Sequence, residues 1–145
     1  MTRNPANQQG FSLIELLVAL TLLSIGIFSV ISMQVTAIKS NSIANRQSVA
    51  TALAQETMDD ILSWDISDSR VNATTANAVY FLNEPNNANA NITISGAGTF
   101  SATYSTTINT PVTGTTQVVV NIFNVTNGVN DPTPLVSITG CKRVT

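Results

Sequence analysis

A single carboxylate, Glu15, lies near the start of a stretch, residues 11–33, that is otherwise uncharged and mostly apolar. A charged side chain in a membrane helix costs on the order of 2.5 to 3.5 kcal/mol at the bilayer centre, and less near an interface. Cleavage of the chain after Gly10 would offset this cost, because the new α-amino group of Phe11 would lie about one helical turn from Glu15. In that case a cation and an anion would share the apolar end of the segment.

The carboxylate of Glu15 has more than one candidate partner. Within one helix it can partly neutralise the amine of Phe11, and in a bundle of identical helices it can reach the amine of a neighbouring copy. An intermolecular pair would set the axial stagger of the helices, since a buried ion pair is better evidence for register than for stability. The alternative is a carboxylate that extends to the lipid headgroups.

Residues 11–33 are long enough to cross a bilayer as a helix. About 23 residues with a rise of 1.5 Å cover about 35 Å. A secretory signal peptide has a shorter apolar region with a cleavage site behind it, whereas here helix-compatible sequence continues past Met33. Gly26 is the only helix-weakening residue in the segment. The segment is predicted to be a membrane-spanning helix.

The helix is predicted to continue as an amphipathic segment over residues 34–64 and to end near Ser63 or Trp64, with a total length of about 80 Å. Lys39 and Arg46 interrupt its apolar face, and we expect their charged ends to reach solvent or acidic residues of neighbours. The apolar face comprises Val35, Ile38, Ile43, Val49, Ala50, Leu53, Ala54, Ile61 and Trp64.

Residues 10–20, GFSLIELLVAL, resemble the class III signal of type IV pilins and pseudopilins. The resemblance implies that a prepilin peptidase cleaves after Gly10, that Phe11 is N-methylated, and that Glu15 pairs with a neighbour's N-terminus. Residues 50–62 are similar to the end of the spine helix in minor pilins of the PilV kind. Many major pilins have a proline in the apolar helix and a C-terminal disulfide loop. This chain has no proline between Ala6 and Asn83 and one cysteine, which favours a minor pilin.

The family resemblance also implies location and partners. Residues 1–10 are expected to be a cleaved leader, and the rest a single-pass protein of the bacterial inner membrane with an extracytoplasmic C-terminal domain, later part of a pilus at the cell surface. The implied partners are the prepilin peptidase, other major and minor pilins, and the inner-membrane assembly platform.

Residues 65–145 are predicted to form a small domain with four antiparallel strands at 90–95, 99–108, 117–125 and 135–144. Apolar residues 79–82 and the polar loop 83–89 are interpreted as the connection from the helix to this sheet. A sheet with one apolar face must bury that face, and we expect it to pack against the outer half of the helix. The predicted fold class is α+β, with a long N-terminal helix packed against a small antiparallel sheet.

The composition argues against several functions. The net charge is −2, and Glu84 and Asp131 are the only charged residues between positions 71 and 140, so no nucleic-acid surface is expected. The chain has no histidine and no nucleophile elbow, phosphate loop or metal-ligand spacing, so we expect neither an enzyme nor a cofactor. Cys141 is expected to be a small buried apolar residue, the alternatives being an intermolecular partner or a lipid attachment site.

Five acidic residues lie around the predicted helix end. The simplest interpretation is a solvated face. Because carboxylates at a helix C-terminus oppose the helix dipole, a cation site or a contact with Lys or Arg of another subunit is the alternative. Their spacing matches no EF-hand loop, and no metal site is predicted. The residues are Glu56, Asp59, Asp60, Asp65 and Asp68.

The leading functional hypothesis is a prepilin-like structural subunit that enters a type IV pilus as a minor pilin and supports its assembly, priming or adhesion. One alternative is a minor pseudopilin of type II secretion. A different class is a binding module on a membrane stalk, whose Asn- and Thr-rich domain recognises a glycan, a surface or DNA.

Overall fold

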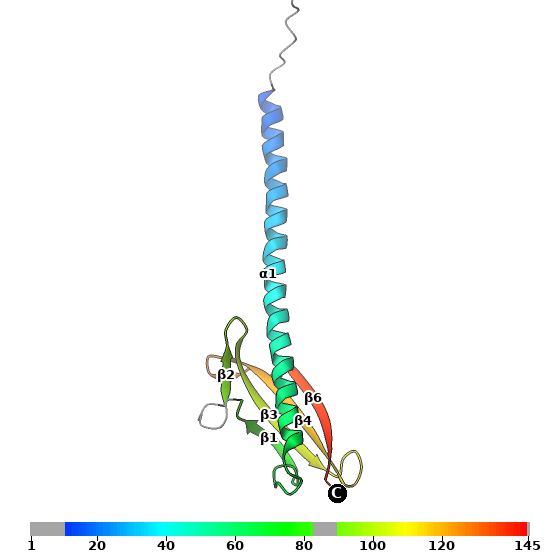
Figure 1. Cartoon of the computed structure of the whole chain (residues 1–145). Coiled ribbons are helices and arrows are strands. Elements are labelled where there is room, and N and C mark those ends of the chain that lie inside the picture. The colour runs from blue at the N-terminus through cyan, green and yellow to red at the C-terminus, as the bar shows by residue number, and fades with distance from the viewer. Residues whose placement is uncertain (1–10, 83–89, 145) are drawn as a thin grey trace, which may run out of the picture. The chain divides into compact units, whose positions relative to one another are not determined.

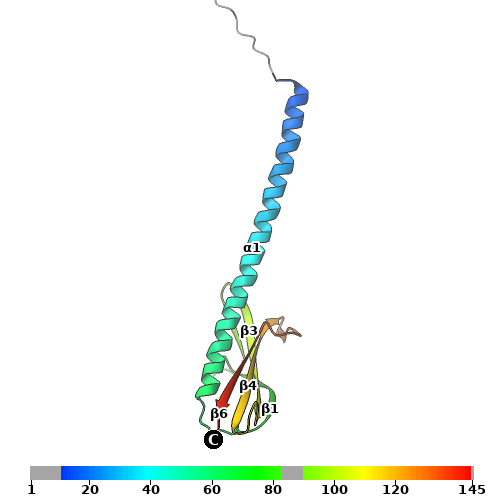
Figure 2. The same cartoon turned by 90° about the vertical axis from the view of Figure 1, so that its right-hand side faces the viewer.

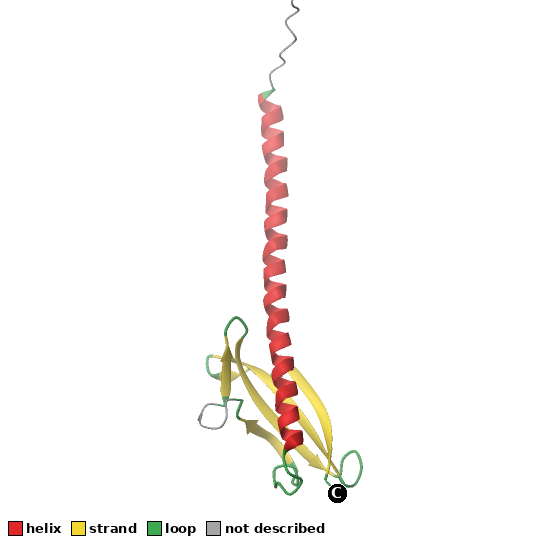
Figure 3. Cartoon of the chain, viewed as in Figure 1, coloured by secondary structure: helices red, strands yellow, loops and turns green. Residues whose placement is uncertain are grey.

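The computed structural model describes residues 11–82 and 90–144, so the expected leader and the polar loop 83–89 lie outside the described residues. It has one helix followed by strands, which confirms the α+β prediction (Figures 1 and 3). The elements are α1 (Leu13–Ser63), β1 (Thr75–Tyr80), β2 (Asn91–Ile94), β3 (Gly98–Ile108), β4 (Thr115–Thr126), β5 (Val129–Asn130) and β6 (Val136–Arg143). The chain divides into two compact units, Met1–Ser40 and Asn41–Thr145.

Helix α1 begins at Leu13, two residues later than predicted. The Ser12 carbonyl accepts hydrogen bonds from the N–H groups of Glu15 (3.0 Å) and Leu16 (3.1 Å), which makes Ser12 the residue that precedes the first turn. The helix ends at Ser63, as predicted. The helix continues through Gly26 without a break, because one glycine destabilises a helix by only about 1 kcal/mol.

The hydroxyl groups on helix α1 between residues 13 and 36 form hydrogen bonds within the helix. Thr21, Ser24, Ser29, Ser32 and Thr36 each donate to a main-chain carbonyl three or four residues earlier, at 2.7–3.0 Å. Hydrocarbon offers no hydrogen-bond partner, so a hydroxyl can enter it at low cost only with such an internal acceptor. These polar residues are therefore compatible with a membrane-spanning segment.

The four predicted strands correspond to β2, β3, β4 and β6, and they form the predicted antiparallel meander. The central pair is β3 with β4, joined from Phe100↔Asn124 to Ile108↔Thr116. β2 pairs with residues 98–101 of β3, and β6 pairs with residues 115–122 of β4. Strand boundaries differ from prediction by at most two residues.

Two strands were not predicted, and both are short edge strands. β1 replaces part of the predicted connection and pairs with residues 102–106 of β3, so it shares that edge end to end with β2. Its Thr-Ala-Asn-Ala sequence lacks alternation, and a register shift occurs where Asn77 has a φ of 49°. The free edge of β3 therefore decides that this segment is a strand.

β5 lies inside the predicted turn 127–134. It forms a hairpin with β4 through the two-residue turn Asn127-Gly128, where φ is 54° and 79°. Asn-Gly favours this turn because both residues tolerate positive φ. The dipeptide was thus a usable sequence signal for this hairpin.

The core of the second unit lies between one face of α1 and the facing side of β3 and β4, as Figure 2 shows from the side. Burial alternates along β4, as expected for a strand with one covered face. The buried apolar residues that form this helix–sheet layer are Ala50, Leu53, Ala54, Met58 and Ile61 from the helix and Phe100, Ala102, Tyr104, Val118, Val120 and Ile122 from the sheet.

The apolar face of α1 was predicted to begin at Val35, but the first buried residue of the helix is Ala50. Val35, Ile38 and Ile43 remain 59%, 71% and 61% exposed. Within the second unit, the β2–β3 turn makes contacts with the helix at Asn45 and Arg46. Ile43 lies before these contacts.

Arg46 does not extend along the helix into solvent. Its side chain is half-buried, and Nε donates to the Ala97 carbonyl at 3.1 Å, while Asn45 Nδ2 donates to the Gly96 carbonyl at 3.1 Å. The turn offers carbonyl acceptors because Gly96 and Gly98 adopt φ of 78° and 123°. Arg46 and Asn45 therefore attach the hairpin to α1.

Cys141 is exposed, and the expectation that it is buried was wrong. Side chains alternate along β6, and Gly140 faces the helix, where an added Cβ would lie 2.8 Å from Met58 Sδ. The next residue, Cys141, must therefore point away from α1.

Candidate functional site

The predicted cleavage and pairing site lies at the start of α1. Gly10 is outside the described residues, Phe11 is 87% exposed, and Glu15 is in the first turn, where its negative charge complements the helix dipole. The spacing of Ser12 and Glu15 would suit a capping box, but the first-turn bonds that the structure describes use the Ser12 carbonyl. Within the described residues the Glu15 carboxylate has no hydrogen-bond or ion-pair partner.

The helix that carries Glu15 has the properties of a membrane span. Its most apolar 18-residue window has a mean hydropathy of 2.4, and none of that window is buried by the rest of the described chain. Exposed apolar surface on this scale marks a site of contact with lipid or protein. This segment therefore presents an apolar surface suited to contact with lipid or with other apolar helices.

At the other end of α1, Lys142 caps the helix. Its Nζ donates to the Leu62 carbonyl at 2.6 Å and to the Trp64 carbonyl, both of them acceptors left open where a helix ends. A lysine there also complements the negative end of the helix dipole. The contact joins β6 to the helix end across about 80 residues of sequence.

Replacing Lys142 by Met should lower the free energy of unfolding by about 1–2 kcal/mol, because the apolar stem remains and two charge-assisted hydrogen bonds are lost. Urea titration of the full chain, followed by fluorescence of the single tryptophan, measures this. Lys39→Met removes the same charge from an exposed helical position and serves as the control. Equal unfolding midpoints for the two variants would contradict the capping role.

The acidic cluster is divided among separate local contacts. Asp65 accepts from the main-chain N–H (2.8 Å) and hydroxyl (2.6 Å) of Ser67. Asp68 binds the guanidinium of Arg70 through two hydrogen bonds from Nε and one from Nη2, and also accepts the Arg70 N–H at 2.8 Å. Within the described residues, no group of three or more His, Cys, Asp or Glu is placed to hold a metal ion.

These contacts lower the pKa values of two carboxyl groups. Hydrogen bonds from the Arg70 side chain and then its N–H shift the pKa of Asp68 from 3.8 to about 2, and hydrogen bonds from Ser67 lower the pKa of Asp65. A folded-state pKa below the unfolded value means that the unfolded chain binds protons more readily as pH falls. The stabilisation is therefore present above the unfolded pKa and is lost as the pH falls toward 2.

Acidification should accordingly lower the urea midpoint between about pH 4 and pH 2, and Asp68→Asn should flatten this part of the profile. The reason is that the variant has no carboxylate to protonate at this position. Asp59→Asn, an exposed acidic position on the helix, is the matched control and should keep the wild-type profile. A profile for Asp68→Asn that parallels wild type would exclude the contribution of the Asp68–Arg70 pair.

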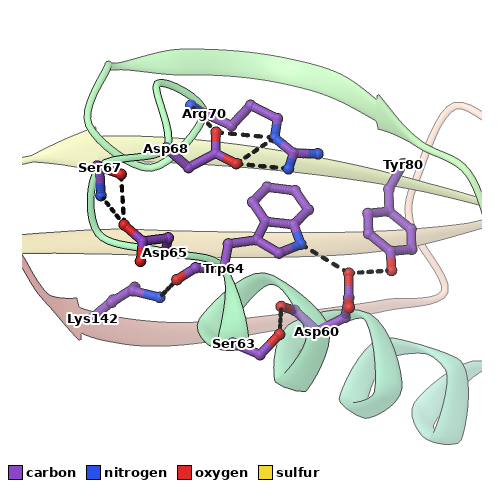
Figure 4. A network of polar contacts seen from close by, with 9 residues as sticks. All are labelled: Asp60, Ser63, Trp64, Asp65, Ser67, Asp68, Arg70, Tyr80 and Lys142. Carbon is purple, nitrogen blue, oxygen red and sulfur yellow. Dashed lines mark hydrogen bonds and ion pairs between the residues drawn. The ribbon is translucent and has the colours of Figure 1, made fainter.

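Asp60 belongs to an aromatic cluster that the sequence did not reveal. Its Oδ2 accepts from Trp64 Nε1 at 3.0 Å and from the Tyr80 hydroxyl at 2.7 Å (Figure 4). The Trp64 ring stacks near-parallel with Tyr80 (6.4 Å between centroids, 19°) and edge-on with Tyr104 (5.6 Å, 84°). The Arg70 guanidinium carbon lies 3.8 Å from the Trp64 ring centroid, a cation–π contact.

These residues line a pocket of about 460 Å³, together with Val79 and Phe81. They come from the end of α1, the following loop, β1 and β3, so their meeting depends on the sheet topology. The inward position of Tyr104 follows from alternation along β3 and was predictable. The position of Tyr80 was not predictable in this way, because the sequence did not predict strand β1.

The comparison with family models finds a prokaryotic N-terminal methylation motif at residues 5–31. The match includes Gly10, Phe11 and Glu15 and ends within the apolar helix. Neither the comparison with curated proteins nor that with solved structures gives a match. The chain thus carries a methylation motif at the head of a long apolar helix suited to membrane anchoring, which supports a type IV pilin-like or pseudopilin precursor.

Proposed function

We propose that this chain is a prepilin-like structural subunit that is cleaved after Gly10, N-methylated at Phe11 and incorporated as a minor pilin into a type IV pilus. The single observation that carries the proposal is the methylation motif at the head of an apolar helix that no other part of the described residues covers. Such a helix needs lipid before assembly and neighbouring helices after it.

Membrane insertion is supported by the side chains of the apolar segment. Its threonines and serines from position 21 onward bond to the helix's own carbonyls and require no external partner. Glu15 is the charged exception, and no described residue partners it. A processed N-terminal amine is a suitable partner, because the pair neutralises both charges at the apolar end.

Helix packing in the assembled form is supported by the shape of the apolar surface. Leu22, Ile27 and Val30 border a hollow at Gly26, where nothing lies within 4 Å of an added Cβ. Small residues let helix backbones approach closely in an apolar medium, where packing drives association. The assignment to a minor rather than a major subunit rests on the PilV-like helix end, the proline-free apolar helix and the single cysteine.

The test is quantitative mass spectrometry of sheared surface filaments, reading the N-terminal peptide and the abundance of this chain against the dominant subunit. An N-methylated Phe11 peptide at low stoichiometry is the expected result. Near-equal abundance would make the chain a major subunit. A methylated peptide confined to membranes, with the chain co-purifying with secretion components, would make it a type II secretion pseudopilin. An uncut leader in every fraction would overturn the proposal.

A further inference from the structure

The pocket beside the end of α1 gathers an unusual share of the chain's aromatic residues. The sequence has one Trp and two Tyr, and all three line this pocket, with Phe81 as a fourth aromatic ring. Tyr104 is 6% exposed and meets the Trp64 ring edge-on, whereas Phe81 and Val79 are 40% and 51% exposed. The pocket therefore combines fixed inner rings with accessible apolar groups outside.

The inner rings are held in place by hydrogen bonds. Asp60 Oδ2 accepts from both Trp64 Nε1 and the Tyr80 hydroxyl, and the two rings lie within 19° of parallel (Figure 4). Because Tyr104 meets Trp64 edge-on, the indole cannot tilt without losing that contact. A preorganised aromatic surface loses little conformational entropy when a ligand packs on it.

Two charged side chains of the pocket also retain unused hydrogen-bonding groups, an acceptor on Asp60 and a donor on Arg70. Asp60 Oδ1 and Arg70 Nη1 have no hydrogen-bond partner among the residues that the structure describes, although both side chains line the pocket. The Arg70 charge is balanced by Asp68 at 2.7 Å, so the guanidinium can donate without presenting a strong net positive field.

This combination selects among ligand classes. A quaternary ammonium group has no N–H or O–H to donate to Asp60, and the Trp64 ring, which such a cation favours most, already has the Arg70 guanidinium 3.8 Å from its centroid. An anionic ligand would meet Asp60 and an arginine that is already paired. A neutral sugar ring fits both features, because its C–H faces pack on aromatic rings while its hydroxyls donate to a carboxylate and accept from a guanidinium.

We propose that the pocket formed by Asp60, Trp64, Arg70, Tyr80 and Phe81 binds a pyranose ring of a neutral glycan. Trp64 and Tyr80 provide the fixed wall, Phe81 the accessible stacking surface, Asp60 the acceptor and Arg70 the donor. All these residues belong to the second unit, so the inference does not depend on how the apolar helix is processed or assembled.

Trp64 supplies the readout, since it is the only tryptophan in the chain. The full chain is held in amphipol, because detergents with sugar headgroups would compete. It is titrated with the methyl glycosides of glucose, galactose, mannose and N-acetylglucosamine while tryptophan emission is recorded. At least one glycoside should give a saturable change. Phe81→Ala and Asp60→Asn should each weaken binding at least about tenfold. The first removes the stacking surface, and in the second the amide oxygen is needed by Trp64 and Tyr80, so that an NH2 group replaces the Oδ1 acceptor.

The matched control is Phe123→Ala, which removes the same side chain from a half-buried position on β4 that does not line the pocket, and it should bind like wild type. Circular dichroism and the urea midpoint establish that each variant is folded. No saturable change with any glycoside, or unchanged binding by folded Phe81→Ala, would overturn the proposal. So would a response to choline in place of the glycosides.

Discussion

Glu15→Ala should leave membrane insertion intact and lower the amount of this chain in sheared filaments by at least about tenfold, which corresponds to about 1.4 kcal/mol per assembly step. The apolar helix becomes more hydrophobic without the carboxylate, so insertion has no reason to fail. If the chain is cleaved after Gly10 as proposed, the substitution removes the partner of the Phe11 amine. A lone buried charge is far less favourable than a pair, so the remaining amine would oppose packing.

The measurement is the ratio of this chain in the sheared fraction to that in the membrane fraction, by quantitative immunoblot. Glu15→Gln keeps the shape of the side chain and should behave like Ala, whereas Glu56→Ala removes an exposed carboxylate in the second unit and should behave like wild type. Incorporation of Glu15→Ala at the wild-type ratio would contradict the hypothesis that the Glu15 pair sets the register of neighbouring helices. Loss of the variant from the membrane fraction would show that Glu15 acts in insertion instead.

Phe100→Ala should have the largest effect on the fold, lowering the free energy of unfolding by about 3–5 kcal/mol. Phe100 is fully buried and is among the largest fully buried side chains between α1 and the sheet. Its removal loses apolar burial and leaves a cavity that the paired strands on either side cannot close. Since small domains are stable by only about 5–15 kcal/mol, this is a large fraction of the total.

Urea unfolding of the full chain, followed by Trp64 emission, gives the midpoint. Phe123→Ala is the comparison, because Phe123 lies on the same sheet but on the side away from the helix. This variant should lower the free energy of unfolding by less than about 1 kcal/mol. Similar midpoints for the two variants would contradict the assignment of the core to the helix-facing side.

The sequence alone determined the features that depend on neighbouring residues. The run of apolar residues over 11–33 and the continuing helical pattern predicted α1 to within two residues at its start and one at its end, because helix hydrogen bonds join residues four apart. Alternation and turn residues located β2, β3, β4 and β6. The family resemblance at Gly10, Phe11 and Glu15 needed no folded structure, since it rests on contiguous residues, and a methylation motif is matched over them.

The tertiary structure decided what depends on contacts between distant segments. Thr75–Tyr80 is a strand because β3 has a free edge, although its own sequence alternates poorly. Lys142 caps a helix about 80 residues earlier because β6 runs beside the helix end, and no local pattern encodes that contact. Cys141 is exposed because the tight approach of Gly140 to Met58 fixes which face of β6 turns inward.

The aromatic pocket shows the same division most clearly. Trp64 and the acidic residues near it were visible in the sequence, but Asp60 became an acceptor for two ring donors only when β1 brought Tyr80 beside the helix end. Tyr104 reached the same place through the register of β3. Short-range periodicity therefore specified the elements. Strand pairing and the packing of the helix on the sheet then brought together side chains and carbonyls that lie 20 to 80 residues apart, such as Asp60 with Tyr80 and Lys142 with the Leu62 carbonyl.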